Sequence, residues 1–244
     1  MAAAGDADAV HRVAIVTFPR LQPLDAVGPH EVFAGANHDT PRYDCRLVAR
    51  EPGPVVTESG LRLHAEALGD PDEVDTLLLT GGGGVRAAAR DEELVAWIRQ
   101  AAAGAHRVAT VCSGTFLGGA AGLLDGRRVT THWARAGQLA EAHPRAEVDP
   151  DPIYVRDGDL WTSAGVTAGI DLALALVEED HGPELAQTIA RWLVMFLRRP
   201  GGQSQFSVPV WGDAVPAGPV RRAQDLVHAE PGGDWTVAEL AERV

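Results

Sequence analysis

Residues 106–115 read HRVATVCSGT. The apolar run Val108–Val111 leads directly into Cys112, and small residues follow. This pattern predicts a buried strand that ends at the cysteine and a helix that begins just after it. In a parallel α/β sheet that place is the carboxyl end of a strand, where ligands bind. Cys112 is therefore the centre of the candidate site.

Strands and helices are expected to alternate on both sides of this stretch. The apolar runs predict strands at 13–16, 43–49, 75–79 and 129–131, and two hairpins around Ser59-Gly60 and Asp157-Gly158. The predicted helices span residues 24–33, 91–99, 115–124, 133–142, 167–180 and 183–198. Such alternation predicts an α/β fold in which helices cover both faces of a mostly parallel sheet.

The composition changes after Arg198. Prolines and glycines become frequent, which predicts a linker over 199–219. Beyond it we expect a short helix over 220–229 and a second helix that begins near Thr236 and is capped by Asp234. The predicted domains are 11–198 for the α/β domain and 220–244 for the incomplete start of another.

The overall composition excludes several classes of protein. The formal charge of −13 at pH 7 argues against nucleic-acid binding by this stretch alone, because phosphate contacts need a basic surface. No apolar run approaches the roughly 20 residues that span a bilayer, and no secretory signal is seen. The two cysteines, Cys45 and Cys112, cannot form a dense disulfide framework. We expect a cytoplasmic protein with both cysteines as thiols and without membrane contact.

Cys112 is expected to be a reactive thiol. Free amides at a helix N-terminus favour the thiolate and lower the pKa of a thiol. The alternative is a buried structural cysteine, which is the interpretation we favour for Cys45 in mid-strand. The glycine run after the 75–79 strand places Gly82 and Gly83 as candidates to direct backbone amides at an anion, although such a run is often only a loop.

Two further polar residues are candidates for this site. His132 follows the 129–131 strand and is a candidate to hold the thiolate or shuttle a proton. From spacing alone, however, a partly buried histidine bonded to backbone is the commoner case. Asp25 lies after the first strand, where a helix cap explains it equally well. The histidine spacing indicates no metal site, and no cofactor is expected.

Four segments together resemble the ThiJ/PfpI superfamily, which is related to class I glutamine amidotransferases. They are LDAVGPHEVF (24–33), LLLTGGGG (77–84), TVCSGTFLGGAAGLLDGRRVTTHW (110–133) and LWTSAGVTAGIDLALALVEE (160–179). The resemblance implies a flavodoxin-like three-layer sandwich with Cys112 at a sharp strand-to-helix turn, the cysteine elbow. It also implies that Gly82 and the Ser113 amide lie near an oxyanion pocket. His132 would then face the cysteine, with Asp25 as the acidic partner.

Differences within the superfamily narrow the expected activity. Aspartate at position 25 is similar to isonitrile hydratase-like members, whereas the deglycase branch has glutamate. Protease-like members have a histidine directly after the cysteine, where this chain has Ser113, so peptidase activity is not expected. The hydratases usually have threonine there, which leaves hydration open.

The C-terminal residues resemble a transcription regulator. RRPGGQSQFS (198–207), a helix and DWTVAELAERV (234–244) are similar to the join between such a sensor domain and the paired helix-turn-helix domain of AraC-type, GlxA-like regulators. The chain ends before any recognition helix. We therefore expect DNA contact only through a region missing after Val244.

Two functions remain from the sequence. The first is the ligand-sensing domain of an AraC-family DNA-binding transcription regulator, in which a small-molecule effector above Cys112 alters DNA binding. The resemblance also implies a homodimer. The alternative is an isonitrile hydratase-like enzyme in which Cys112 attacks an electrophilic carbon, Asp25 handles protons, and the amides of Gly82 and Ser113 hold the developing charge. The elbow leaves both open, and the C-terminal motif favours the regulator.

Overall fold

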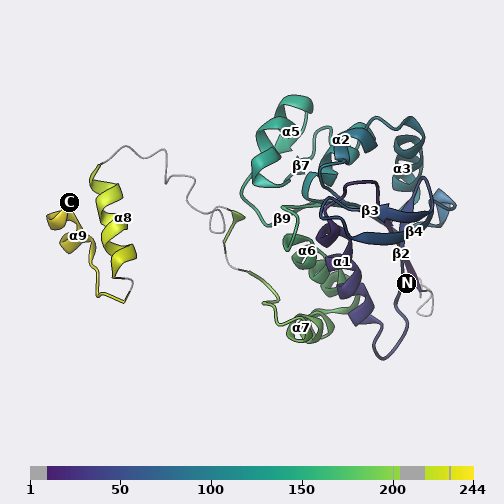
Figure 1. The fold of residues 1–244 in the computed structure, drawn as a ribbon. Helices are drawn as coiled ribbons and strands as arrows, with labels where there is room; N and C mark the ends of the chain where they lie inside the picture. The colour runs from purple at the N-terminus through teal and green to yellow at the C-terminus, as the bar shows by residue number, and fades with distance from the viewer. Residues whose placement is uncertain (1–9, 200, 204–217, 231) are drawn as a thin grey trace, which may run out of the picture. The chain divides into compact units, whose positions relative to one another are not determined.

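A computed structural model describes residues 10–199, 201–203, 218–230 and 232–244. It divides into two compact units, Met1–Gln203 and Ser204–Val244 (Figure 1). The first unit extends to Gln203, five residues past the predicted domain end, because Arg199 and Gln203 are hydrogen-bonded to it. Most of the predicted linker lies outside the described residues.

Within the described residues, the first unit is built on an eight-stranded sheet with the order β3-β4-β2-β1-β5-β6-β10-β9. The inner strands, from β4 to β10, are parallel, and the edge strands β3 and β9 are antiparallel to their neighbours. The strands are β1 (His11–Val16), β2 (Tyr43–Ala49), β3 (Gly53–Val56), β4 (Arg62–Ala67), β5 (Thr76–Leu79), β6 (Arg107–Val111), β9 (Tyr154–Asp157) and β10 (Leu160–Ser163). The predicted mostly parallel sheet is confirmed.

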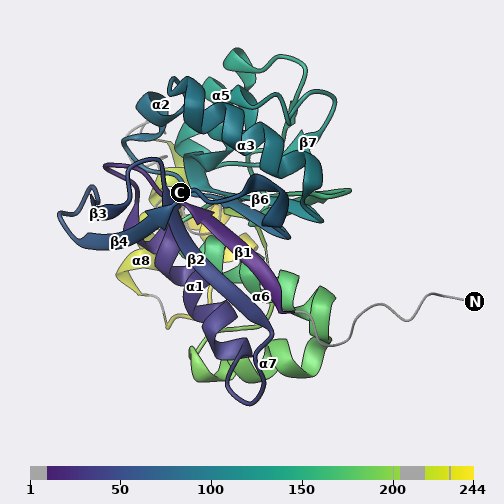
Figure 2. The ribbon, with the colours of Figure 1, turned by 90° about the vertical axis from the view of Figure 1, so that its right-hand side faces the viewer.

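Helices cover both faces of this sheet (Figure 2). On one face α1 packs against α6 and α6 against α7, while on the other α3 and α4 pack against β5. The helices are α1 (Pro23–Ala36), α2 (Val85–Ala88), α3 (Glu92–Gly104), α4 (Thr115–Ala120), α5 (Ala136–Ala142), α6 (Ala168–His181) and α7 (Pro183–Trp192). The central strands β5 and β6 are buried along their whole length, as parallel strands covered on both faces require. The three-layer, flavodoxin-like sandwich is therefore confirmed.

Smaller elements lie beside the main sheet. The 3-10 helices are η1 (Pro71–Glu73), η2 (Cys112–Gly114) and η3 (Trp133–Arg135). The predicted 129–131 strand is only β7 (Arg128–Val129), which pairs with β8 (Glu147–Val148) in a separate two-stranded sheet. No helix among the described residues is long and apolar enough to cross a membrane.

The second unit contains α8 (Pro219–Ala229) and α9 (Val237–Arg243). The prediction that Asp234 caps α9 is wrong, because Thr236 is the N-cap. The Thr236 hydroxyl accepts the Glu239 N–H at 3.2 Å, and the Glu239 carboxylate accepts the Thr236 N–H at 3.1 Å. This reciprocal capping box satisfies two amides at the start of the helix.

The register of the main sheet brings the carboxyl ends of its central strands together. Val16 of β1 pairs with Leu79 of β5, and Leu79 pairs with Thr110 of β6. Ser163 of β10 pairs with Val111 of β6. The loops that follow these four strands therefore meet at one edge of the sheet, where open α/β folds bind ligands.

Candidate functional site

Cys112 lies at the sharp turn between β6 and the following helices. It opens η2 with a φ of 58°, a left-handed backbone conformation that is strained for a residue with a side chain. Gly165, after β10, packs directly against it, since a Cβ at Gly165 would lie 2.1 Å from Cys112 Cβ. The cysteine elbow is therefore held in place by bare backbone from the neighbouring loop.

Asp25 is fully buried in α1 and is hydrogen-bonded to two loops of the site. Its Oδ1 accepts the Val166 N–H at 2.8 Å, and its Oδ2 accepts the Gly81 N–H at 3.0 Å. Its carboxylate is also near enough to the Cys112 thiol to raise the pKa of that thiol. Asp25 is not the cap of α1, because the side chain of Gln22 fills that position. The structure thus brings Asp25 and Cys112 together.

The proton affinities of these two groups depend on each other. Burial raises the pKa of Asp25 to about 6. Burial, with the charge of Asp25 as a smaller cause, raises the pKa of the Cys112 thiol to about 12. The predicted thiolate is therefore not favoured: η2 is a single turn with a small dipole, and desolvation of the sulfur outweighs it. At neutral pH the pair is a thiol beside a carboxylate, so Asp25 can accept the thiol proton.

The glycine run after β5 passes against the elbow. A Cβ at Gly81 would lie 2.6 Å from Ser113 N and 2.9 Å from Asp25 Oδ2, so only glycine fits. The Gly82 N–H donates to Ser113 Oγ at 2.9 Å, and the nearby Ser113 amide lowers the pKa of the Cys112 thiol against the larger effect of burial. The Gly82 amide, predicted as a donor to an oxyanion, is thus already bonded within the protein.

Glu58 is a site residue that the sequence analysis missed. It lies in the turn between β3 and β4, and its Oε2 accepts the Gly83 N–H at 2.9 Å. This engages the other amide predicted to face an anion. The Glu58 charge also raises the pKa of Asp25 and of Cys112. The contact spans 25 residues, and the turn sequence carries no signal of it.

His132 is placed at the N-cap of η3. Its Nδ1 accepts the Ala134 N–H at 3.3 Å, and burial, with the nearby Arg135, lowers its pKa. In the described part of the chain no hydrogen bond or ion pair joins the His132 ring to Cys112. The structure shows the alternative of a partly buried histidine bonded to backbone. The preceding residue makes the connection instead, because Thr131 Oγ1 donates to the Cys112 carbonyl oxygen at 2.7 Å.

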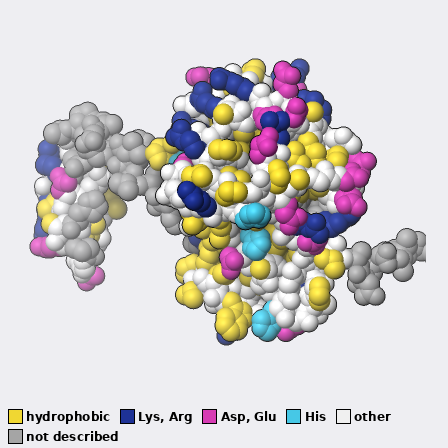
Figure 3. Space-filling model, turned by 45° about the vertical axis from the view of Figure 1, so that its right-hand side comes forward, with side chains coloured by type: hydrophobic (Ala, Val, Ile, Leu, Met, Phe, Trp, Pro, Cys, Tyr) yellow, Lys and Arg dark blue, Asp and Glu magenta, His cyan; other side chains and the backbone are white. Residues whose placement is uncertain are grey.

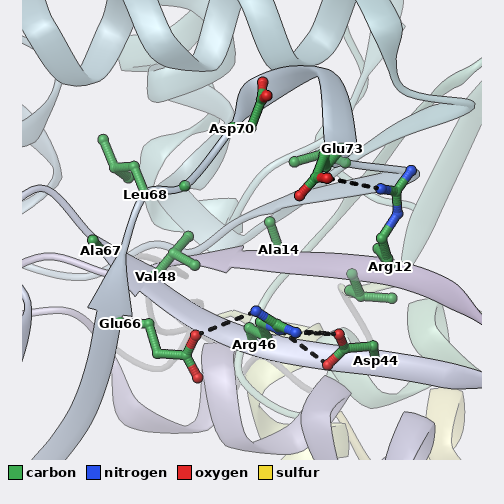
Figure 4. Close-up of a pocket in the computed structure, with 13 residues that line it drawn as sticks. Arg12, Ala14, Asp44, Arg46, Val48, Glu66, Ala67, Leu68, Asp70 and Glu73 are labelled. Atoms are coloured by element: carbon green, nitrogen blue, oxygen red, sulfur yellow. Dashed lines mark hydrogen bonds and ion pairs between the residues drawn. The ribbon is translucent and has the colours of Figure 1, made fainter.

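A separate hollow of about 240 Å³ lies on the sheet near β1, β2 and β4 (Figure 4). Its arginines are both paired: Arg46 with Asp44 and Glu66, and Arg12 with Glu73. The hollow therefore offers no unpaired arginine to an anionic ligand. The convergence of loops at Cys112 remains the better candidate site.

Comparison of the sequence with known proteins identifies its family and several relatives. Residues 11–179 match the model of the DJ-1/PfpI family. The isonitrile hydratase of Pseudomonas putida is 37% identical over 179 residues, which cover 73% of this chain and 75% of the hydratase. The HTH-type transcriptional regulator CdhR of Pseudomonas aeruginosa is 32% identical over 228 residues. That match covers 91% of this chain and 65% of the regulator, so the chain spans just under two thirds of CdhR.

A solved structure shares the fold over a similar range. The crystal structure of a ThiJ/PfpI family protein from Pseudomonas syringae superposes with a TM-score of 0.71 and 30% identity. The superposition covers 91% of this chain and 87% of that one.

Proposed function

The chain belongs to the DJ-1/PfpI family, and from that premise we propose that it is the ligand-sensing part of an AraC-type, helix-turn-helix transcription regulator. A small-molecule effector binds beside Cys112 and Asp25 and changes how the native protein binds DNA. Such control requires that the effector bind the two states of the protein with different affinity.

One observation carries the proposal: the similarity to a regulator continues beyond the α/β unit. The CdhR match covers 91% of the chain, or about 222 residues, which is more than the 203 residues of the first unit. The match to the hydratase covers 73% of the chain. Beyond the first unit the chain itself carries sequence that resembles the start of a helix-turn-helix domain, where Thr236 and Glu239 form a capping box.

The charge of the chain supports a division of roles. Its formal charge is −13 at pH 7, and on the face shown in Figure 3 acidic and arginine side chains are interspersed over the described residues. DNA affinity depends on cations that neutralise phosphates. A first unit of this kind is suited to sensing, while DNA contact belongs to the helix-turn-helix domain.

The chemistry of the site also supports sensing. The amides of Gly82 and Gly83 are bonded to Ser113 and Glu58, so neither is a preformed donor for an oxyanion. The Cys112 thiol is protonated at neutral pH, because burial and Asp25 raise its pKa. A protonated nucleophile without these oxyanion donors is poorly prepared for rapid attack.

An isonitrile hydratase-like enzyme is the second candidate. The observation that favours it is the 37% identity to the Pseudomonas putida hydratase, together with the buried carboxylate of Asp25 beside the Cys112 thiol. In this case Asp25 takes the thiol proton as the sulfur attacks the isonitrile carbon, and the same carboxyl group returns the proton to that carbon to give a thioimidate. Water then adds to the carbon and the C–S bond breaks, which releases the formamide and restores the thiol.

Selection from random duplexes tests the proposal. The native protein, expressed from its complete reading frame, is expected to enrich a common sequence and to bind it at least about 10³-fold more tightly than random DNA at fixed salt. The same preparation is assayed for isonitrile turnover, with Cys112→Ala as the control. Turnover that is lost in Cys112→Ala, without any preferred DNA sequence, would establish the enzyme instead. Enrichment of no sequence would refute the regulator whatever the turnover.

A further inference from the structure

Gln203, the last residue of the first unit, has a side chain that is almost completely buried, with the residue 5% exposed. Glutamine is seldom buried unless its amide is fully paired. Its Nε2 donates to the carbonyl oxygens of Thr131 at 3.0 Å and Pro152 at 3.1 Å. Its Oε1 accepts the Trp133 N–H at 2.8 Å. A side chain inside the predicted linker, 199–219, is thus built into the α/β unit.

The loop that binds Gln203 is the loop that holds the elbow. Thr131, whose carbonyl accepts from Gln203, donates its hydroxyl to the Cys112 carbonyl at 2.7 Å. The adjacent Thr130 accepts a hydrogen bond from Thr115 Oγ1 at 3.1 Å, directly after η2. One residue, Thr131, therefore separates the Gln203 amide from the cysteine. The contacts span some 72 residues of sequence, so they are tertiary and specific.

The same segment is attached elsewhere without touching this loop. Arg199 forms an ion pair with Asp171 of α6, with Nε 2.8 Å from Oδ1. Arg198 forms an exposed pair with Glu178, also on α6. Gln203 thus provides the contact to the loop at the elbow, and the two arginines anchor the segment to the opposite layer.

We propose that Gln203 is the positioning residue through which a change at Cys112 reaches the residues that follow the first unit. A change at Cys112 that moves Thr131 and the nearby Trp133 removes two hydrogen bonds of the buried Gln203 amide, which is unfavourable, so the segment detaches. Coupling of this kind is reciprocal, and loss of Gln203 must therefore change Cys112. The inference rests on the proposed function for its output, DNA binding, while the coupling itself lies inside the first unit.

The coupling is measured as a change in the alkylation rate of the Cys112 thiol. Iodoacetamide alkylates the thiol, with loss of iodide and the thiol proton, and peptide mass spectrometry gives the rate at each cysteine against pH. In Gln203→Ala and Gln203→Glu the alkylation rate at Cys112 is expected to change at least about fivefold, the low end of allosteric coupling. The pH midpoint of that rate should shift with it. The rate at Cys45 should not change. Arg198→Gln is the matched control, because it loosens the same segment outside the loop.

A double-mutant cycle separates coupling from general destabilisation. Thr131→Val removes the hydroxyl that reaches Cys112, so Gln203→Glu in that background should have little further effect on the Cys112 rate. Additive effects, an unchanged rate in both Gln203 variants, or an equal effect of Arg198→Gln would each overturn the proposal. If Gln203→Ala does not fold, the Gln203→Glu cycle still decides.

The reverse direction gives an independent measurement. Alkylation of Cys112 is expected to increase hydrogen exchange in the peptide that contains Gln203, and to leave the α7 peptide unchanged. Unchanged exchange at Gln203 would contradict the proposal. Coupling without DNA binding would refute the proposed function alone, and DNA binding without coupling would refute the role of Gln203 alone.

Discussion

At the scale of single residues, the site is defined by the buried carboxylate of Asp25 beside the Cys112 thiol. The negative charge of Asp25 raises the pKa of the thiol, and Glu58 contributes least among its causes. Asp25→Asn should therefore lower the pKa of Cys112 and speed its alkylation, about tenfold for each pKa unit recovered. Glu58→Gln, the matched control, should have a smaller effect in the same direction. Slower or unchanged alkylation of Asp25→Asn, measured from pH 7 to 10, would contradict this assignment.

Asp25 also gives the stability of the first unit a pH dependence of known sign. Its pKa is raised to about 6 in the folded protein from the ordinary 3.8, so between these values the folded state binds more protons. This contribution to stability is fully present below about pH 4 and is lost as the pH rises through 6. The free energy of unfolding of the wild type minus that of Asp25→Asn should fall by up to about 3 kcal/mol over this range. Urea titrations at several pH values measure it, and a constant difference would show that Asp25 is not desolvated.

At the scale of elements, α7 ends where the sequence shows no stop signal. The predicted helix over 183–198 stops at Trp192, and Val194 takes a φ of 55°. The Met195 N–H donates to the Ala190 carbonyl at 2.8 Å and the Val194 N–H to the Arg191 carbonyl at 3.1 Å. This is a Schellman ending, in which glycine normally occupies the left-handed position.

Val194→Gly should consequently stabilise the first unit. The side chain is 91% exposed, so little burial is lost, and left-handed backbone costs an L-residue roughly 1–2 kcal/mol. The entropy of glycine in the unfolded chain offsets about 0.5–1 kcal/mol, which leaves a net gain of up to about 1.5 kcal/mol. Leu193→Gly, at a right-handed position, should destabilise instead. Thermal unfolding compares the two, and equal destabilisation by both would contradict the strain at Val194.

The fold could be predicted because its signals are local. Apolar strand runs and amphipathic helices alternate along the chain, and the parallel sheet follows from that alternation. The predictions failed where tertiary contacts or unusual residues determine the bounds or pairing of an element. Examples are the valine that ends α7 and the separation of β7 from the main sheet. The cap of α9 was misplaced by two residues because Asp234 and Thr236 are both good N-cap residues.

The site was predictable in part for the same reason. The turn after a buried strand predicts Cys112 as a site residue, and Asp25 was assigned through a family motif. Glu58, Val166 and Gln203 act through contacts with residues far away in the sequence, so no local pattern marks them. That His132 faces Cys112 was implied by the family resemblance alone, whereas its spacing favoured the hydrogen bond to backbone that the structure has.

At the scale of the whole molecule, the first unit combines the buried site at Cys112 with a C-terminal segment, residues 198–199 and 201–203, that is hydrogen-bonded to the loop beside that site. The formal charge of the whole chain, −13 at pH 7, is unsuited to DNA, the site of the first unit holds a protonated thiol, and Gln203 ties the last described residues of the unit to the loop at the elbow. These features are the ones that the proposed sensor requires. We therefore predict that chemistry at one buried sulfur changes an affinity for DNA.

The most direct test is the affinity of the native protein for its selected duplex before and after alkylation of Cys112. Fluorescence anisotropy titrations at fixed salt compare untreated protein with protein treated by iodoacetamide at alkaline pH, and Cys112→Ser, which retains Cys45, controls for other sites. We predict that alkylation changes the Kd at least about fivefold in the wild type and leaves that of Cys112→Ser unchanged. An equal Kd for treated and untreated wild type would contradict the account.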